Sequence, residues 1–327
     1  MSARPVECAG LCDLQVNGFG GVDFNAADLT PDAVDHAAEV MGRTGVTLFL
    51  ATLISSSFEH FAACAGAVTA ARTPALAGIH MEGPYLSPED GPRGAHRREQ
   101  MQPATPDDFD RRQDAADGRI RLVTLAPEVP GALDLIDRLV ASDVRVAIGH
   151  TIASPETIQE AVARGATIST HLGNGCAAVL PRHPNLLWEQ LAADNLVAGF
   201  IVDGHHLTPS TVKVMVRAKT PGRSVLVTDA TAAAGQPEGE YRLGGQAVRR
   251  SASGRVTLAG LDRLAGSALT LDDAVGNVVR FAHVRLDEAL AMASTQPAAA
   301  IGLAPRGRLE ATWDEEVARF VVHAIHE

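Results

Sequence analysis

The sequence has little positive charge and no basic stripe. Its 28 lysines and arginines stand against 39 aspartates and glutamates, which gives a formal net charge of -11. Without a basic stripe to neutralise phosphates, the composition argues against nucleic-acid binding. Any anionic substrate must therefore be met by local positive groups.

Cysteines and long apolar runs are also scarce. The longest apolar run, GVTLFLATLI at residues 45–54, is about half the length of a membrane span and indicates a buried strand. The first residues, MSARPVECAG, lack the charged and then apolar build of a signal peptide. The four cysteines have neither CxxC spacing nor the density of a disulfide-stapled scaffold, so we expect a cytoplasmic protein. They are Cys8, Cys12, Cys64 and Cys176.

Short apolar runs alternate along the chain with amphipathic segments that predict helices. Several helical segments begin with Ser or Thr followed by Pro, a pair that suits the N-cap and the first helical residue. These pairs start at Thr30, Thr105, Ser154 and Thr208. The eight apolar runs cover residues 11–16, 46–53, 75–81, 120–126, 144–150, 166–171, 196–202 and 224–229.

The eight runs are apolar nearly throughout, which indicates parallel strands buried on both faces. Their number and their alternation with helices predict an α/β fold, a closed (β/α)8 barrel of the TIM type. Periodicity alone leaves an open, doubly wound sheet as the alternative. No GxGxxG motif follows the first run, so a dinucleotide site lacks its usual support.

The pattern changes after residue 235. Residues 238–260 predict hairpin strands, with Gly244 and Gly245 suited to a tight turn. Two helical patterns follow, near residues 269–282 and 286–301, and short strand-like pieces end the chain.

Ligand-type residues stand at the expected strand ends, where the active sites of parallel barrels lie. Glu82, His150 and His171 each follow or close an apolar run, so they can converge while their backbones stay rigid. Two imidazoles and one carboxylate suit zinc and leave a fourth position for water, whose pKa zinc lowers to about 7. Asp229, at the end of another run, can take that proton and return it to a leaving group.

Each of these residues also has a structural interpretation. A single strand-end histidine is more often hydrogen-bonded than metal-bound, Glu82 can cap or bridge, and Asp229 can begin an Asx turn. The joint pattern favours a metal site, because four separate strand ends carry ligand or acid/base types.

Eight segments between residues 11 and 312 contain these side chains and the loops around them. They read DLQVNGFGGVDFN, HMEGPYLSPEDGPRGAH, VTLAPE, IGHT, GATISTHLGNG, VDGHHLTP, LVTDATAAAG and LAGSALTL. In this order they resemble the N-acetylglucosamine-6-phosphate deacetylases of the amidohydrolase superfamily. The resemblance implies a metal-dependent homodimer that hydrolyses the acetamide of N-acetylglucosamine 6-phosphate to glucosamine 6-phosphate and acetate.

The same resemblance assigns individual roles. It implies that Glu82, His150 and His171 hold the metal and that Asp229 is the catalytic acid/base. The substrate-binding residues that it implies are Ala95, His96, Asn174, Gly175, Arg182, His206, Leu264, Ala265 and Gly266. In that family the arginine matched by Arg182 reaches the sugar phosphate across a dimer interface. Residues 264–266 match a loop that closes over the substrate, and His206 rather than His205 matches the sugar-binding histidine.

Two short stretches refine this hypothesis. The glycines of residues 173–175 let the backbone approach a ligand closely and Asn174 supplies an amide, although an ordinary glycine-rich turn is the alternative. Many amidohydrolases carry His-x-His in the first strand to hold a second metal, whereas this chain has Gln15 and Asn17. Neutral amides are poor zinc ligands, so we expect one divalent ion, zinc.

The chain departs from the family before its first strand. Members usually carry several tens of residues there, and about ten stand here. We therefore expect a barrel over residues 11–305 with a β insertion near 238–260, and a reduced, partial β-sandwich from residues 1–10 and 306–327. A plain surface turn is the alternative interpretation of Arg182, in which case the substrate lacks the phosphate.

Three functions follow from these alternatives. The first is the deacetylase, and the second is an amidohydrolase acting on another N-acyl amino sugar, unphosphorylated or galacto-configured. The third is a non-catalytic relative that binds a sugar. The acid/base residue Asp229 beside a metal site argues against the third, because a binding protein needs no such group.

Overall fold

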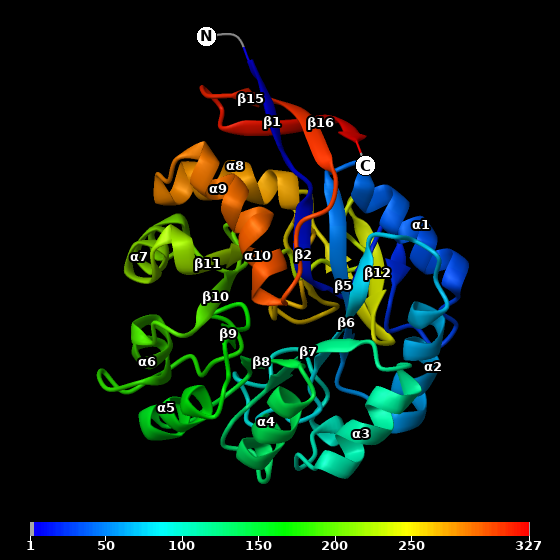
Figure 1. Ribbon diagram of the computed structural model, residues 1–327, viewed down its shortest axis with the longest axis vertical. Helices are drawn as coiled ribbons and strands as arrows, with labels where there is room; N and C mark the ends of the chain where they lie inside the picture. The colour runs from blue at the N-terminus through cyan, green and yellow to red at the C-terminus, as the bar shows by residue number, and fades with distance from the viewer. Residues whose placement is uncertain (1–2, 327) are drawn as a thin grey trace.

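A closed parallel barrel forms the centre of the molecule. The computed structural model describes residues 3–326, and its largest sheet has eight strands in the order β11-β10-β9-β8-β7-β6-β5-β2 (Figure 1). Sheet order follows chain order without reversal, so the barrel prediction is confirmed and the doubly wound alternative is wrong. The strands are β2 (Leu11–Val16), β5 (Val46–Ile54), β6 (Leu76–Glu82), β7 (Ile120–Leu125), β8 (Arg145–Ile148), β9 (Ile168–Ser169), β10 (Val197–Phe200) and β11 (Ser224–Leu226).

A few bonds at the ends of β2 and β11 close the barrel. Val16 forms a single parallel bridge with Ala230 just beyond β11. The Asp13 carboxylate accepts a hydrogen bond from Thr228 Oγ1 over 2.6 Å. The seam therefore depends on side chains as well as on the backbone, and it brings the ends of these two strands together.

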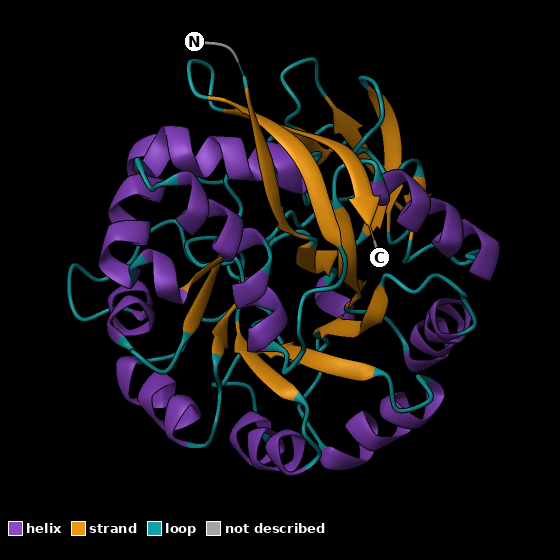
Figure 2. Ribbon diagram, turned by 45° about the horizontal axis from the view of Figure 1, so that its top comes forward, coloured by secondary structure: helices purple, strands orange, loops and turns teal. Residues whose placement is uncertain are grey.

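Helices surround the barrel strands (Figure 2). The helices predicted at Thr30, Thr105, Ser154 and Thr208 all form, and each of these side chains accepts a hydrogen bond from the third helical N–H. The helices are α1 (Pro31–Gly42), α2 (Phe58–Thr69), α3 (Pro106–Ala115), α4 (Ala132–Ala141), α5 (Pro155–Ala163), α6 (Leu186–Ala192), α7 (Pro209–Lys219), α8 (Leu271–Ala282), α9 (Leu286–Ala293) and α10 (Thr295–Ala300), with short 3-10 turns η1 (Arg98–Gln100) and η2 (Pro221–Arg223).

The helical pattern at residues 286–301 forms two helices rather than one. The break lies at Ser294, whose φ of -137° and ψ of -83° are not helical. Pro297 explains it, because proline has no N–H to donate and its ring would clash with the carbonyl four residues earlier in a continuous helix.

Two small antiparallel sheets lie outside the barrel. The insertion sheet contains β12 (Gly239–Leu243), β13 (Gln246–Arg250) and β14 (Val256–Leu258), and the positive φ angles of Gly244 and Gly245 form its predicted turn. The terminal sheet contains β1 (Arg4–Ala9), β15 (Arg308–Asp314) and β16 (Arg319–His326), and both ends of the chain lie beside it (Figure 1). A two-stranded hairpin, β3 (Gly18–Phe19) and β4 (Val22–Asp23), completes the strands.

The two small sheets pack in different places. Leu309 and Trp313 of the terminal sheet join the large barrel core, whereas Val248 and Val256 of the insertion sheet belong to a separate apolar cluster. The insertion sheet therefore has its own small apolar core, apart from that of the barrel. Among residues 3–326, no helix combines the length and the apolar character that a membrane crossing requires.

Candidate active site

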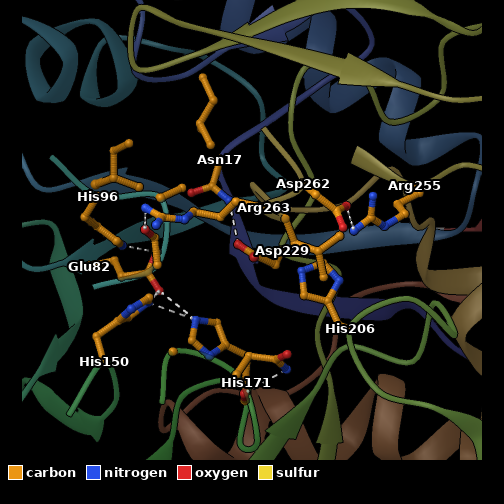
Figure 3. Close-up of a pocket in the computed structure, with 18 residues that line it drawn as sticks. Asn17, Glu82, His96, His150, His171, His206, Asp229, Arg255, Asp262 and Arg263 are labelled. Carbon is orange, nitrogen blue, oxygen red and sulfur yellow. Dashed lines mark hydrogen bonds and ion pairs between the residues drawn. The ribbon is translucent and has the colours of Figure 1, made fainter. Parts of the chain in front are cut away.

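Three predicted ligands meet at one end of the barrel. Glu82 is the last residue of β6, and His150 and His171 follow β8 and β9. His171 Nε2 lies 3.1 Å from His150 Nε2 and 3.2 Å from Glu82 Oε1, and His150 Nε2 lies 3.3 Å from that oxygen (Figure 3). All three side chains are buried.

This triangle fits a single metal ion. Ligand atoms that coordinate a tetrahedral zinc ion lie roughly 3.3–3.6 Å apart, close to the separations seen here. His150 Nδ1 is 2.7 Å from the carbonyl oxygen of Pro92, which only accepts, so Nδ1 carries the proton and Nε2 presents its lone pair to the cluster. Lone pairs of imidazole and carboxylate that face one another need a cation between them, and the donor set is one that a divalent metal accepts.

The backbone at the cluster adopts a conformation that is rare for residues other than glycine. His150, His171 and Asp229 have φ angles of 51°, 28° and 51°. A left-handed backbone is costly for such residues and persists where the surrounding structure holds it, often at functional sites. Here it turns each side chain inward at the point where its strand ends.

Asp229 lies next to the cluster and is held by Asn17, the residue that follows β2. Asn17 Nδ2 donates to Asp229 Oδ1 over 2.6 Å. Burial raises the pKa of Asp229 to about 6, and the negative charge of Glu82 adds to the increase. A carboxyl group with a pKa near neutrality suits proton transfer in both directions.

A second amide side chain, Gln15 of β2, supports the cluster in the same way. Gln15 Nε2 donates to Glu82 Oε1 over 2.7 Å. Burial opposes ionisation of Glu82, but the interactions of its carboxyl with the adjacent rings of His150 and His171 outweigh burial and hold the pKa of this carboxyl well below its usual range. Gln15 and Asn17 therefore hold carboxylates, a role for which a neutral amide is suited.

A cavity of about 370 Å³ opens over the cluster, within the usual size range of small-molecule sites. Most of the predicted substrate residues line it, namely Ala95, His96, Asn174, Gly175, His206, Leu264 and Gly266. Ala265 does not line it, because its side chain is buried in the apolar cluster of the insertion sheet. Arg182 is exposed and lies outside the lining of this cavity.

The two histidines at the cavity wall are held by different partners. His206 Nδ1 donates a hydrogen bond to Asp203 Oδ2 over 2.7 Å, which leaves Nε2 free. Nδ1 of His96 lies 3.0 Å from Ser55 Oγ, and burial lowers the pKa of His96 to about 3, so this ring is neutral near pH 7. The neighbouring His205 bonds to the carbonyl of Ser253 and does not line the cavity.

The glycines after His171 have a specific steric role. A Cβ on Gly175 would come within 2.8 Å of His150 Nδ1, and the residue has a φ of +55°. The close approach made possible at Gly175 is thus to the ring of His150, while Asn174 donates back to the carbonyl of His171 over 3.2 Å. The loop both orders the cluster and lines the cavity.

Several cavity residues were not predicted. Arg255, Asp262 and Arg263 line the cavity from the insertion sheet and the segment after it. The sequence predicts hairpin strands there but gives no sign that they pack over the barrel. Asp203 was also missed, although it stands in the VDGHH segment three residues before His206.

Comparisons with known proteins agree in family and fold. The amidohydrolase family matches residues 8–314. An N-acetylglucosamine-6-phosphate deacetylase of Lysinibacillus sphaericus is 33% identical over 316 residues, covering 94% of this chain and 79% of the relative. An N-acetylgalactosamine-6-phosphate deacetylase of Shewanella sp. (strain ANA-3) is 35% identical over 296 residues, covering 89% and 73%.

A solved structure extends the similarity to the whole chain. It is a mutant N-acetyl-D-glucosamine-6-phosphate deacetylase from Mycobacterium smegmatis in complex with N-acetyl-D-glucosamine-6-phosphate. It aligns with a TM-score of 0.90 at 31% identity and covers 100% of this chain and 86% of that chain.

Proposed function

Because this chain belongs to the amidohydrolase family, we propose that it hydrolyses the acetamide of N-acetylglucosamine 6-phosphate to glucosamine 6-phosphate and acetate. The observation that carries the proposal is the placement of Asp229 beside the cluster of Glu82, His150 and His171 at the floor of one cavity. The deacetylase from Lysinibacillus sphaericus and the substrate complex from Mycobacterium smegmatis support the substrate class.

Glu82, His150 and His171 would hold one divalent ion, and we propose zinc because two imidazoles and one carboxylate suit it. The chemistry that such an ion supplies is Lewis acidity, which polarises a carbonyl and lowers the pKa of water. Gln15 and Pro92 keep Glu82 and His150 in the orientations described above.

Asp229 moves the proton. Asn17 engages its Oδ1, so Oδ2 is the oxygen that accepts a proton from the attacking water as the C–O bond forms. The same carboxyl then gives that proton to the sugar nitrogen as the C–N bond breaks, and the amine and acetate leave. His206 and His96 orient the sugar for this attack, and Asp203 holds the His206 ring.

The N-acetylgalactosamine 6-phosphate reaction is the second candidate. It uses the same acetamide chemistry, and the Shewanella relative that bears this name is 35% identical, against 33% for the Lysinibacillus relative. The two sugars differ in the configuration of one hydroxyl, which is not part of the acetamide that is hydrolysed. The wall of the cavity therefore decides between them.

We also propose a cytoplasmic homodimer. The four cysteines are free thiols, in keeping with a reducing compartment. Arg182 lies on an exposed loop outside its own cavity, a position from which it would need a second subunit to meet a substrate.

An acetate-release assay on purified, metal-loaded protein tests the substrate. N-acetylglucosamine 6-phosphate, its galacto epimer and unphosphorylated N-acetylglucosamine are compared by kcat/KM. The proposal expects the highest value for the first sugar. A higher value for the epimer would favour the second candidate, and no release from any of the three would overturn both.

A further inference from the structure

The turn that follows His150 is bound by one carboxylate. Glu128 Oε1 accepts a hydrogen bond from Ile152 N over 2.8 Å, and Glu128 Oε2 accepts one from Thr151 Oγ1 over 2.5 Å. Thr151 Oγ1 in turn accepts a hydrogen bond from Ala153 N over 2.8 Å. Glu128 therefore contacts two successive residues of this turn directly and a third through Thr151.

The backbone at His150 needs outside contacts to keep its conformation. Its φ of 51° is unfavourable for a residue other than glycine and persists where the surrounding structure fixes it. The carbonyl of His150 accepts a hydrogen bond from Ser87 N over 3.0 Å. Just after His150, the large apolar side chain of Ile152 is 49% exposed and adds little packing. The bonds to Glu128 therefore restrain the chain where this side chain does not.

The interactions of Glu128 are directed at this turn. Within residues 3–326 it forms no ion pair, and its two hydrogen bonds to side chain and backbone both come from residues 151 and 152. Burial raises the pKa of Glu128, and these two bonds act against that increase. A carboxylate buried without a cation is costly unless hydrogen bonds compensate it. The turn after His150 supplies that compensation.

Glu128 belongs to a sequence segment that the cluster and the cavity do not use. It is the last residue of VTLAPE and stands three residues after β7. Because β7 and β8 are neighbours in the barrel, the chain after β7 can reach the chain after β8. Glu128 neither lines the cavity nor belongs to the cluster of Glu82, His150 and His171.

We propose that Glu128 is a positioning residue for His150: it fixes the turn over residues 151–153 and so keeps the imidazole directed at Glu82 and His171. The inference rests on the metal site of the proposed function and is independent of the sugar. Because Glu128 lies outside the cavity, it acts on the affinity for the metal and takes no part in proton transfer.

Metal affinity is measured by chelator competition, starting from metal-free wild type, Glu128→Ala and the matched control Asp35→Ala. Asp35 Oδ1 likewise accepts two hydrogen bonds from a turn, from Arg72 N over 2.9 Å and Thr73 N over 2.8 Å, but Asp35 lies on α1 and does not line the cavity. Glu128→Ala is expected to weaken metal binding about 10- to 100-fold, as loss of a partner that orients a ligand does. Asp35→Ala should stay within about twofold of wild type.

Two milder variants keep the test decisive if Glu128→Ala does not fold. Glu128→Gln retains an acceptor for Ile152 N and gains an NH₂ group that Thr151 Oγ1 can accept, so its metal affinity should stay within about threefold of wild type. Thr151→Val removes one of the two bonds, and its affinity should lie between those of wild type and Glu128→Ala. Urea unfolding of the same metal-free proteins measures the loss of stability separately.

A metal affinity of Glu128→Ala, or of Thr151→Val where the alanine variant does not fold, within about twofold of wild type would overturn the inference. An equal loss of affinity in Asp35→Ala would also overturn it, because the effect would then follow general stability. If wild type binds the metal but releases no acetate from N-acetylglucosamine 6-phosphate, the proposed function fails and the inference stands. A wild type that binds no divalent ion would overturn both.

Discussion

Asn17 and Asp229 meet through a 2.6 Å hydrogen bond that joins the end of β2 to the end of β11. The bond lies at the seam where the barrel closes, next to the bridge between Val16 and Ala230. It occupies one oxygen of the carboxylate and leaves the other for proton transfer. The closure of the fold and the orientation of Asp229, the proposed acid/base, thus depend on the same contact.

Asn17→Ala is expected to lower kcat about tenfold, because one net hydrogen bond to a charged group is lost. The bond from Asn17 lowers the pKa of Asp229, so its removal should move the acidic limb of the kcat/KM profile to higher pH. The measurement is the pH profile of acetate release. Asn195→Ala, at an exposed site, is the control, and an unmoved limb would contradict the role of Asn17.

Gln15→Leu should weaken metal binding about 10- to 100-fold, because partners that hold a ligand side chain tune affinity by this amount. Gln15 donates to the buried Glu82, whereas Gln159 makes a similar bond to Glu189 on the surface. Competition with a chelator measures both Gln15→Leu and the control Gln159→Leu. Equal affinities in the two variants would argue against support of Glu82 by Gln15.

Gly175→Ala should also reduce metal affinity, for a steric reason. The added Cβ would come within 2.8 Å of His150 Nδ1, and the φ of +55° is unfavourable for alanine. Gly222→Ala is the matched control, since a Cβ there meets nothing within 4 Å. Metal affinity is measured in the same competition assay. A Gly175→Ala variant with a lower melting temperature but unchanged metal affinity would contradict the steric account.

Asp13 should make stability depend on pH. Burial raises its pKa to about 7 in the folded protein, so the folded state keeps a proton that the unfolded chain releases. The free energy of unfolding contributed by Asp13 is therefore fully present below the ordinary pKa and falls as pH rises toward about 7. Asp13→Asn removes this loss, and its stability relative to wild type should rise by about 1–3 kcal/mol between about pH 5 and pH 8.

Urea unfolding at several pH values tests this expectation, with the exposed Asp117→Asn as the control. Parallel pH dependences for wild type and Asp13→Asn would mean that Asp13 is ionised throughout. Thr228, whose hydroxyl and amide donate to this carboxylate, would then be the group that stabilises the charge.

Much of the barrel follows from local sequence. A strand buried on both faces is apolar at nearly every position, so all eight runs were visible, and Thr30-Pro31 and similar pairs mark helix starts through bonds within one turn. Glu82 and His150 were predictable because parallel strands bring their carboxyl ends to one edge of the barrel. The break before Pro297 was not predicted. Proline is a local signal against a continuous helix, but the residues on both sides of it follow a helical pattern.

The remaining features of the candidate site depend on packing between segments that are distant in the sequence. The hairpin pattern of the insertion sheet gives no information on where the sheet rests, so Arg255 and Arg263 could not be placed in the cavity from sequence. The carboxylate partners of Gln15 and Asn17 are likewise known only once the closed barrel brings the end of β2 near the ends of β6 and β11. Such contacts are set by the tertiary fold and produce no periodic pattern in the sequence.

Single-turnover acetate release by metal-loaded Asp229→Asn tests the central claim most directly. The amide keeps the size of the side chain but accepts no proton, so the rate with N-acetylglucosamine 6-phosphate should fall about 10²- to 10⁴-fold while the bound metal and the affinity for the sugar stay near wild-type values. A rate within about twofold of wild type would contradict the assignment of Asp229 as the group that moves the proton.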